Sequence, residues 1–164
     1  MSLWLSDHDG LLTKYNISKA DSAGHASIYV AGLSAGGSSS SATNGEDAAD
    51  FALSFMEGYQ NILPDFLEEK KVRWQAGLHI GSVTGGLVNV SKVPRFYVLG
   101  ETVRTAFELH SSSLPTRVRI SDIFKNQLGF IQKYRIEAAM KAEEESQETS
   151  ATSAFWLSRN DSFH

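Results

Sequence analysis

The sequence predicts an α+β or α/β fold, in which helices cover a sheet. Segments rich in β-branched and aromatic residues alternate along the chain with segments whose apolar residues recur at helical spacing. The chain has 164 residues, of which 41% are hydrophobic, and it contains no internal repeat. Because a chain of this size can bury one core, we expect a single domain over residues 1–164.

The expected strands are short and lie between turn residues. Residues 15–21 and 27–33 read as a hairpin, and residues 72–90 read as two strands that meet at a bend formed by Gly85 and Gly86. Later strands are expected over residues 96–99, 116–121, 129–138 and 153–159.

Helices are expected between these strands. The longest covers residues 46–63, carries a broad apolar stripe and stops at Pro64. A short helix over residues 121–128 is capped by Ser121 or Asp122. The helix over residues 101–112 can turn four apolar residues toward a core: Val103, Ala106, Phe107 and Leu109.

Three further segments complete the chain. Residues 3–14 have the apolar pattern of a helix that ends before Asn16. Residues 34–45 (SAGGSSSSATNG) hold too few apolar atoms to pack, so we expect a flexible Gly/Ser loop there. Residues 141–153 are expected to form a solvated acidic and polar loop.

Composition excludes several classes of function. The formal charge of −4 and the pI near 5.7 argue against a nucleic-acid partner, which requires a basic surface. The absence of cysteine excludes disulfides and thiolate catalysis. No apolar run reaches the roughly 20 residues of a membrane span, and the N-terminus does not resemble a signal peptide. We therefore expect a soluble, intracellular protein without a membrane span.

Three co-linear motifs resemble the catalytic domain of class III adenylyl and guanylyl cyclases. They are HDGLLTKYNISKADSAGHASIYVAGL (8–33), GLHIGSVTGGLVNVSKVPRFYVLGETVRTAFEL (77–109) and AFWL (154–157). The motifs stand in the family's order and together cover nearly the whole chain. The agreement of three spaced motifs is more specific than any single glycine pattern.

The resemblance implies a ferredoxin-like βαββαβ sandwich and active sites formed between two protomers. Two departures concern the architecture. The family's first strand, which carries a metal-binding Asp and is central to the sheet, has no counterpart in this sequence. A sheet without it would leave rows of backbone groups unpaired, so we expect that the chain is a fragment, that another polypeptide supplies the strand, or that the N-terminal region has been rebuilt. The second departure is the Gly/Ser segment after Leu33, which lies at the surface and costs little.

The resemblance also implies chemistry in which two Mg²⁺ or Mn²⁺ ions convert a nucleoside triphosphate into a cyclic monophosphate. The positions for this chemistry are altered here. His25 stands where the family has a metal-binding Asp, and imidazole is a poor ligand for Mg²⁺. Arg104 replaces the Asn that orients ribose, and Glu108 replaces the Arg that stabilises phosphoryl charge. Because Arg104 and Glu108 stand four residues apart, we expect them to form an ion pair on the helix surface.

The positions that would recognise a nucleotide are also altered. The family's base-selecting residues correspond to Asp21 and Tyr97, of which Asp21 is short and Tyr97 is bulky. The family's triphosphate-binding Lys has only Lys141 as a candidate, and three glutamates follow it. A zinc site at His8, His25 and His79 is disfavoured, because no two of these histidines share an element at ligand spacing. We expect no metal site, and His79 reads as the family's strand histidine beside a sheet neighbour.

The residues that shape turns and packing are retained, including Gly77, Gly81, Gly86, Pro94, Arg95, Gly100, Thr102, Val103 and Ala106. Retained turns combined with altered reactive positions favour a catalytically silent cyclase-homology chain, with no cofactor of its own. Such a chain would serve as a structural or interaction subunit that pairs with a cyclase-like partner or joins a larger assembly. Two alternatives stay open: one half of a heterodimeric cyclase, and a nucleotide sensor without turnover.

Overall fold

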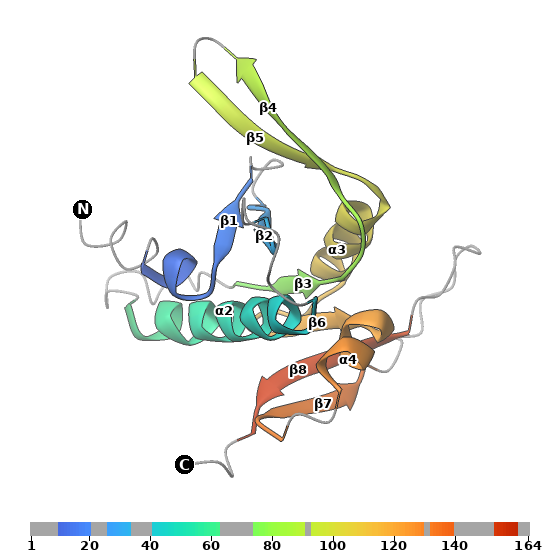
Figure 1. Cartoon of the computed structure of the whole chain (residues 1–164). Coiled ribbons are helices and arrows are strands. Elements are labelled where there is room, and N and C mark those ends of the chain that lie inside the picture. The colour runs from blue at the N-terminus through green and yellow to red at the C-terminus, as the bar shows by residue number, and fades with distance from the viewer. Residues whose placement is uncertain are drawn as a thin grey trace.

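The computed structural model describes residues 10–20, 26–33, 41–62, 74–90, 93–129, 132–139 and 153–160. Residues 10–14 are helical. The elements that follow are β1 (Ile17–Lys19), β2 (Tyr29–Ala31), α2 (Ser41–Ile62), β3 (Ala76–Leu78), β4 (Thr84–Val90), β5 (Val93–Leu99), α3 (Glu101–Ser111), β6 (Val118–Ser121), α4 (Asp122–Leu128), β7 (Tyr134–Ala138) and β8 (Ala154–Arg159) (Figure 1).

Strands and helices combine as the sequence predicts for an α+β fold. A four-stranded sheet has the order β3-β6-β8-β7, in which β3 and β6 are parallel and the other pairs are antiparallel. The strands β1 and β2 form the expected hairpin, and β4 and β5 form a long ribbon that extends from the rest of the fold (Figure 1). Within the described residues, β2 pairs only with β1, and β3 pairs only with β6.

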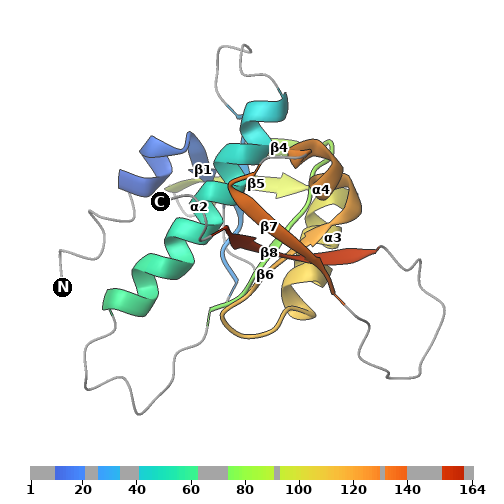
Figure 2. The same ribbon diagram turned by 90° about the horizontal axis from the view of Figure 1, so that it is seen from below.

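The core lies between one face of the four-stranded sheet and the helices α2 and α4. Successive strand residues point to opposite faces, so Val118 and Ile120 of β6 turn to the same side and are buried there. They meet Leu53 and other apolar residues of α2 together with Phe124 of α4 and Leu157 of β8. Seen from below, α2 runs as a long diagonal helix across these strands (Figure 2).

Helix α3 packs on the opposite face of the sheet through Gly77 of β3. A Cβ atom at Gly77 would lie 2.3 Å from the backbone nitrogen of His110 and 2.4 Å from the carbonyl oxygen of Ala106. Only a residue without a side chain therefore allows the helix to approach so closely. This contact explains why the sequence has glycine at the first position of the second family motif.

Residues 41–45 correct the expectation of a loop over 34–45. Helix α2 begins at Ser41, so only residues 34–40 lie outside the described part of the chain. Gly45 is buried, and a Cβ atom there would stand 3.4 Å from side-chain atoms of Gln127 and Ile80. The packing of this small residue against α4 outweighs the weak helix propensity of Ser, Thr, Asn and Gly. The acidic loop expected over residues 141–153 lies outside the described residues except for Ser153.

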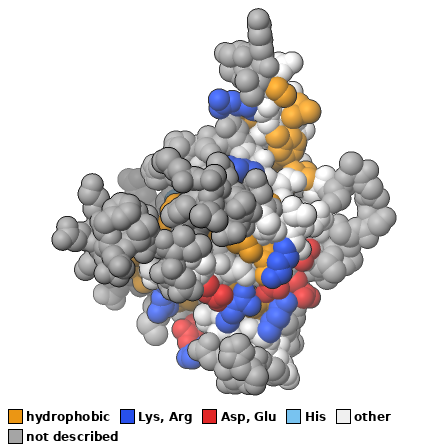
Figure 3. Space-filling model, turned by 90° about the vertical axis from the view of Figure 1, so that its left-hand side faces the viewer, with side chains coloured by type: hydrophobic (Ala, Val, Ile, Leu, Met, Phe, Trp, Pro, Cys, Tyr) orange, Lys and Arg blue, Asp and Glu red, His pale blue; other side chains and the backbone are white. Residues whose placement is uncertain are grey.

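The expected bend at Gly85 and Gly86 is also corrected. Both glycines lie inside β4, opposite Val98 and Tyr97 of β5. A Cβ atom at Gly85 would stand 2.8 Å from the ring of Phe96, so the glycine makes room for an aromatic side chain rather than a corner. Apolar residues of this ribbon are exposed, with Leu87 at 74% and Leu99 at 68%. Figure 3 shows hydrophobic side chains gathered along the ribbon.

Ser121 caps α4, because its hydroxyl accepts a hydrogen bond from the backbone nitrogen of Phe124 at 3.2 Å. None of the helices in the described ranges combines the length and apolar character needed to cross a bilayer.

Candidate functional site

The start of helix α3 is fixed by a glycine turn and one side-chain hydrogen bond. Gly100 has a φ of 138°, a conformation that favours glycine, and it places the chain to enter the helix at Glu101. The hydroxyl of Thr102 then donates to the carbonyl oxygen of Ser82 at 2.7 Å. A Cβ atom at Gly81 would stand 2.4 Å from that hydroxyl, so Gly81 is required for the contact. These contacts hold the helix that carries Arg104 and Glu108.

Arg104 lies between two carboxylates on the exposed face of α3. Its Nη1 donates to Oε1 of Glu108 at 2.5 Å, which confirms the ion pair expected from the sequence. Its Nε donates to Oε2 of Glu101 at 2.9 Å, and its Nη2 contacts the other oxygen of Glu101. Glu101 therefore takes two donors of the guanidinium, an arrangement typical of bidentate arginine–carboxylate pairs. Glu101 was not among the site residues predicted from the sequence, although its spacing of three residues before Arg104 is a signal for such a contact.

The electrostatics of this cluster follow from the contacts. The hydrogen bond from Arg104 lowers the pKa of Glu101, and the same hydrogen bond raises the pKa of Arg104. The guanidinium thus stays charged and bound to two anions. The three side chains carry a formal charge of −1, so the cluster offers no positive centre for a polyphosphate.

The outward face of α3 also carries an aromatic side chain. Phe107 was expected to face a core, but 46% of its surface is exposed and its ring lies 6.0 Å from that of His110. Leu109 is buried as expected. Phe107 and Leu109 differ in burial because the stripe of α3 that contacts β3 is narrow, and Phe107 lies outside it. A single exposed Phe is common on protein surfaces and does not by itself indicate a contact with another molecule.

His79 lies close to the start of α3 in a hydrogen-bonded chain. Its Nδ1 is 2.7 Å from the hydroxyl of Ser121, which is fully buried and already accepts from the backbone nitrogen of Phe124. The hydroxyl proton is therefore free to be donated to Nδ1 of a neutral imidazole. Burial lowers the pKa of His79, while the nearby Glu101 raises it. His79 follows the end of β3 and lies outside the strand expected to carry it, but it contacts Ser121 of the neighbouring strand β6.

The other sequence-derived positions are only partly located. Tyr97 is half-buried in β5, opposite Gly86, and therefore belongs to the ribbon. Asp21, His25 and Lys141 lie outside the described residues. Of the positions named from the sequence, the structure thus brings together Arg104 and Glu108. In the described part of the chain, no group of three His, Cys, Asp or Glu side chains could hold a metal ion.

A family model described as the adenylate and guanylate cyclase catalytic domain matches residues 3–158. The chain belongs to this cyclase family. It is 28% identical over 137 residues to receptor-type guanylate cyclase gcy-28 of Caenorhabditis elegans, covering 81% of this chain and 10% of that protein. It is 28% identical over 153 residues to human retinal guanylyl cyclase 2, covering 91% of this chain and 13% of that protein. This cyclase-family chain therefore spans only about a tenth of the length of these relatives.

Solved cyclase structures share the fold. The guanylate cyclase domain of RhGC from Catenaria anguillulae, solved with GTP, has a TM-score of 0.74 at 21% identity, covering 98% of this chain and 81% of that one. The adenylyl cyclase CyaB of P. aeruginosa has a TM-score of 0.69 at 13% identity, covering 96% and 79%. At these identities the agreement concerns the fold, so the expected cyclase-like α+β architecture is confirmed.

Proposed function

We propose that this cyclase-family chain is catalytically silent and serves as a structural or interaction subunit. The observation that carries the proposal is the position of Arg104 between Glu101 and Glu108. These residues stand on the helix whose family motif supplies a ribose-binding Asn and a phosphate-stabilising Arg. A carboxylate at position 108 repels the charge that the family's Arg stabilises. Loss of such an Arg alone typically costs about 10³ to 10⁵ in rate.

The exposed apolar residues support an interaction role. Leu99 ends β5, and Gly100 alone separates it from α3. Leu99 and Phe107 are both exposed, so ribbon and helix present apolar side chains on consecutive elements. Leu87 lies farther out along β4. One structural relative is described as a non-canonical dimeric guanylyl cyclase domain of a fusion protein from Blastocladiella emersonii, with a TM-score of 0.67 at 19% identity. We infer that the partner is a cyclase-like domain that covers the ribbon and α3.

Activity measurements test the silent assignment. Purified chain is incubated with GTP or ATP and with Mg²⁺ or Mn²⁺, and cyclic nucleotide is quantified beside an active guanylyl cyclase domain. We expect no product and no heat of binding in calorimetry. Binding without product would favour the nucleotide sensor, and product formed only after a cyclase partner is added would favour the half-enzyme. Product from the chain alone would contradict the proposal.

The interaction role needs a separate measurement. Sedimentation velocity of the chain, alone and mixed with an active cyclase domain, reports self-association and pairing. Leu87→Ser with Leu99→Ser removes apolar surface from the ribbon, and we expect this double variant to weaken the complex. Ile123→Ser is the matched control, because Ile123 is similarly exposed but lies on α4. Equal weakening by the control would argue against the ribbon as the contact.

A further inference from the structure

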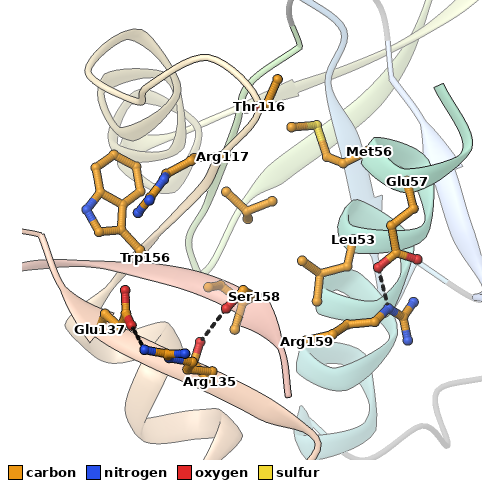
Figure 4. A pocket seen from close by; sticks show the side chains of 12 residues that line it. Leu53, Met56, Glu57, Thr116, Arg117, Arg135, Glu137, Trp156, Ser158 and Arg159 are labelled. Carbon is orange, nitrogen blue, oxygen red and sulfur yellow. Dashed lines mark hydrogen bonds and ion pairs between the residues drawn. The ribbon is translucent and has the colours of Figure 1, made fainter. Parts of the chain in front are cut away.

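A cavity of about 540 Å³ opens between the second half of α2, the residues before β6 and the strands β7 and β8 (Figure 4). This volume lies in the range of small-molecule sites. Its apolar lining consists of Leu53, Met56, Val118, Trp156 and Leu157. The cavity contains none of the residues of the Arg104 cluster and is a separate feature of the molecule.

Two of the three arginines that line the cavity are neutralised within it. Arg135 contacts Glu137 at 2.6 Å. Arg159 donates to Oε1 of Glu57 at 2.7 Å. Dashed lines in Figure 4 mark both of these ion pairs. Three positive and two negative side chains leave the lining with a formal charge of +1, which belongs to Arg117.

Arg117 faces an aromatic ring instead of a carboxylate. Its guanidinium carbon lies 5.4 Å from the centroid of Trp156, and the two side chains stand side by side in Figure 4. An indole face attracts a cation but accepts no strong hydrogen bond, so the guanidinium N–H groups stay available to a ligand. Among the described residues, no ion pair engages Arg117.

Arg119 is not among the residues that line the cavity, but it places a second cation at the ring of Trp156. Its guanidinium carbon also lies 5.4 Å from the centroid of Trp156. One of its nitrogens donates to the carbonyl oxygen of Ser112 at 2.5 Å, while its buried Nε has no hydrogen-bond partner. Two cations that share one ring repel each other, and an anion bound next to them offsets that repulsion. The cavity thus combines an excess positive charge with an apolar wall.

We propose that this cavity binds a small organic carboxylate. The carboxylate accepts two parallel hydrogen bonds from Arg117, and the apolar body of the ligand lies against Trp156 and Met56. A planar monoanion fits the single excess charge and the fork of N–H donors. This inference goes beyond the proposed function, since a silent subunit and an active one could both carry such a site.

Phenylacetate is the probe for the test, and phenylacetamide is its neutral counterpart. Binding to the full chain is followed by the indole N–H signal of Trp156 in a ¹H–¹⁵N spectrum, assigned with Trp156→Phe. We expect a saturable shift with phenylacetate and at least about tenfold weaker binding of phenylacetamide. A shift of equal affinity with both compounds would overturn the proposal, as would no saturable shift with phenylacetate, acetate or octanoate.

Two variants assign the contact. Arg117→Gln is expected to weaken phenylacetate binding by at least about tenfold, because it removes a charged donor pair. Lys19→Gln on β1 is the matched control and should leave the affinity within about twofold, since it removes one positive charge from an exposed side chain outside the cavity lining. Should Arg117→Gln lower the melting temperature, Arg117→Lys decides the matter, because it keeps the charge and loses the fork. Native affinity in Arg117→Lys would rule out the paired hydrogen bonds.

Discussion

Arg104 and Glu108 are joined across one turn of α3, with Nη1 of Arg104 2.5 Å from Oε1 of Glu108. Glu101 holds the other edge of the same guanidinium, with Nε to Oε2 at 2.9 Å. In the family motif these helix positions address the ribose and the phosphates of a nucleotide. Here Arg104 and Glu108 bind each other, so the guanidinium of Arg104 is already paired with carboxylates and is not available to a phosphate.

Releasing Arg104 from its carboxylates should create an anion site. The double variant Glu101→Gln and Glu108→Gln keeps side-chain size and changes the cluster from −1 to +1. We expect weak, salt-sensitive binding of tripolyphosphate that the native chain lacks, measured by calorimetry at low ionic strength. Glu137→Gln, which frees the exposed Arg135, is the control for a general change in charge. Equal binding by native chain and double variant would show that the carboxylates do not block the site.

Gly77→Ala should destabilise the contact between β3 and α3. The added methyl group would stand 2.3 Å from the backbone nitrogen of His110, and backbone atoms cannot move aside as a flexible side chain can. We expect a loss of about 1–3 kcal/mol in the free energy of unfolding, measured by urea denaturation. Gly58→Ala in α2 is the control, since nothing lies within 4 Å of its added Cβ. The free energy of unfolding of Gly58→Ala should rise by about 0.5–1 kcal/mol from helix propensity. A loss in this variant would show that the effect at Gly77 does not depend on its close contact with α3.

Tyr134→Phe should cost stability at the junction of α2 and β7. The buried Tyr134 hydroxyl donates to Asp50 at 2.8 Å, and Asp50 also accepts from Lys133 at 2.9 Å. Burial is the main reason that the pKa of Tyr134 is raised, with the hydrogen bond to Asp50 next, so the hydroxyl stays protonated. Because the acceptor is charged, we expect a loss of about 1.5–3 kcal/mol in urea denaturation. Tyr15→Phe, which removes a half-exposed contact to Ser54, should lose less.

The stability of the chain should fall in mild acid through His79. Burial lowers its pKa below the usual value of 6.5, so the unfolded chain binds a proton at a higher pH than the folded chain does. The contribution of His79 to the free energy of unfolding is therefore fully present above about pH 6.5 and decreases as the pH falls below that value. Urea denaturation at pH 7.5 and pH 5.5 measures the decrease. His79→Gln should make the free energy of unfolding depend less on pH in this range. An unchanged pH dependence would show that a group other than His79 titrates there.

The sequence alone determined the family and most of the elements. Glycines and apolar residues at motif spacing predicted the fold, because turns and hydrophobic periodicity are local properties. The pairing of Arg104 with Glu108 was also predictable, since residues four apart on a helix always face one another. The cap at Ser121 followed from its place before a helical pattern.

Other features depended on neighbours distant in the sequence. Residues 41–45 read as a loop until packing of Gly45 against Gln127 and Ile80 made them helical. Gly85 was interpreted as a bend because the sequence does not show that this glycine makes room for Phe96 on the paired strand.

The two arginines at Trp156 show the same limit for a candidate site. The sequence did not indicate that Arg117 and Arg119 share the ring of Trp156, or that Arg159 is paired with Glu57. The sequence therefore determined which elements form and which reactive groups the chain carries. Only the tertiary structure decided which groups distant in the sequence meet, such as Arg159 with Glu57 and the two arginines with Trp156, because the fold sets those distances.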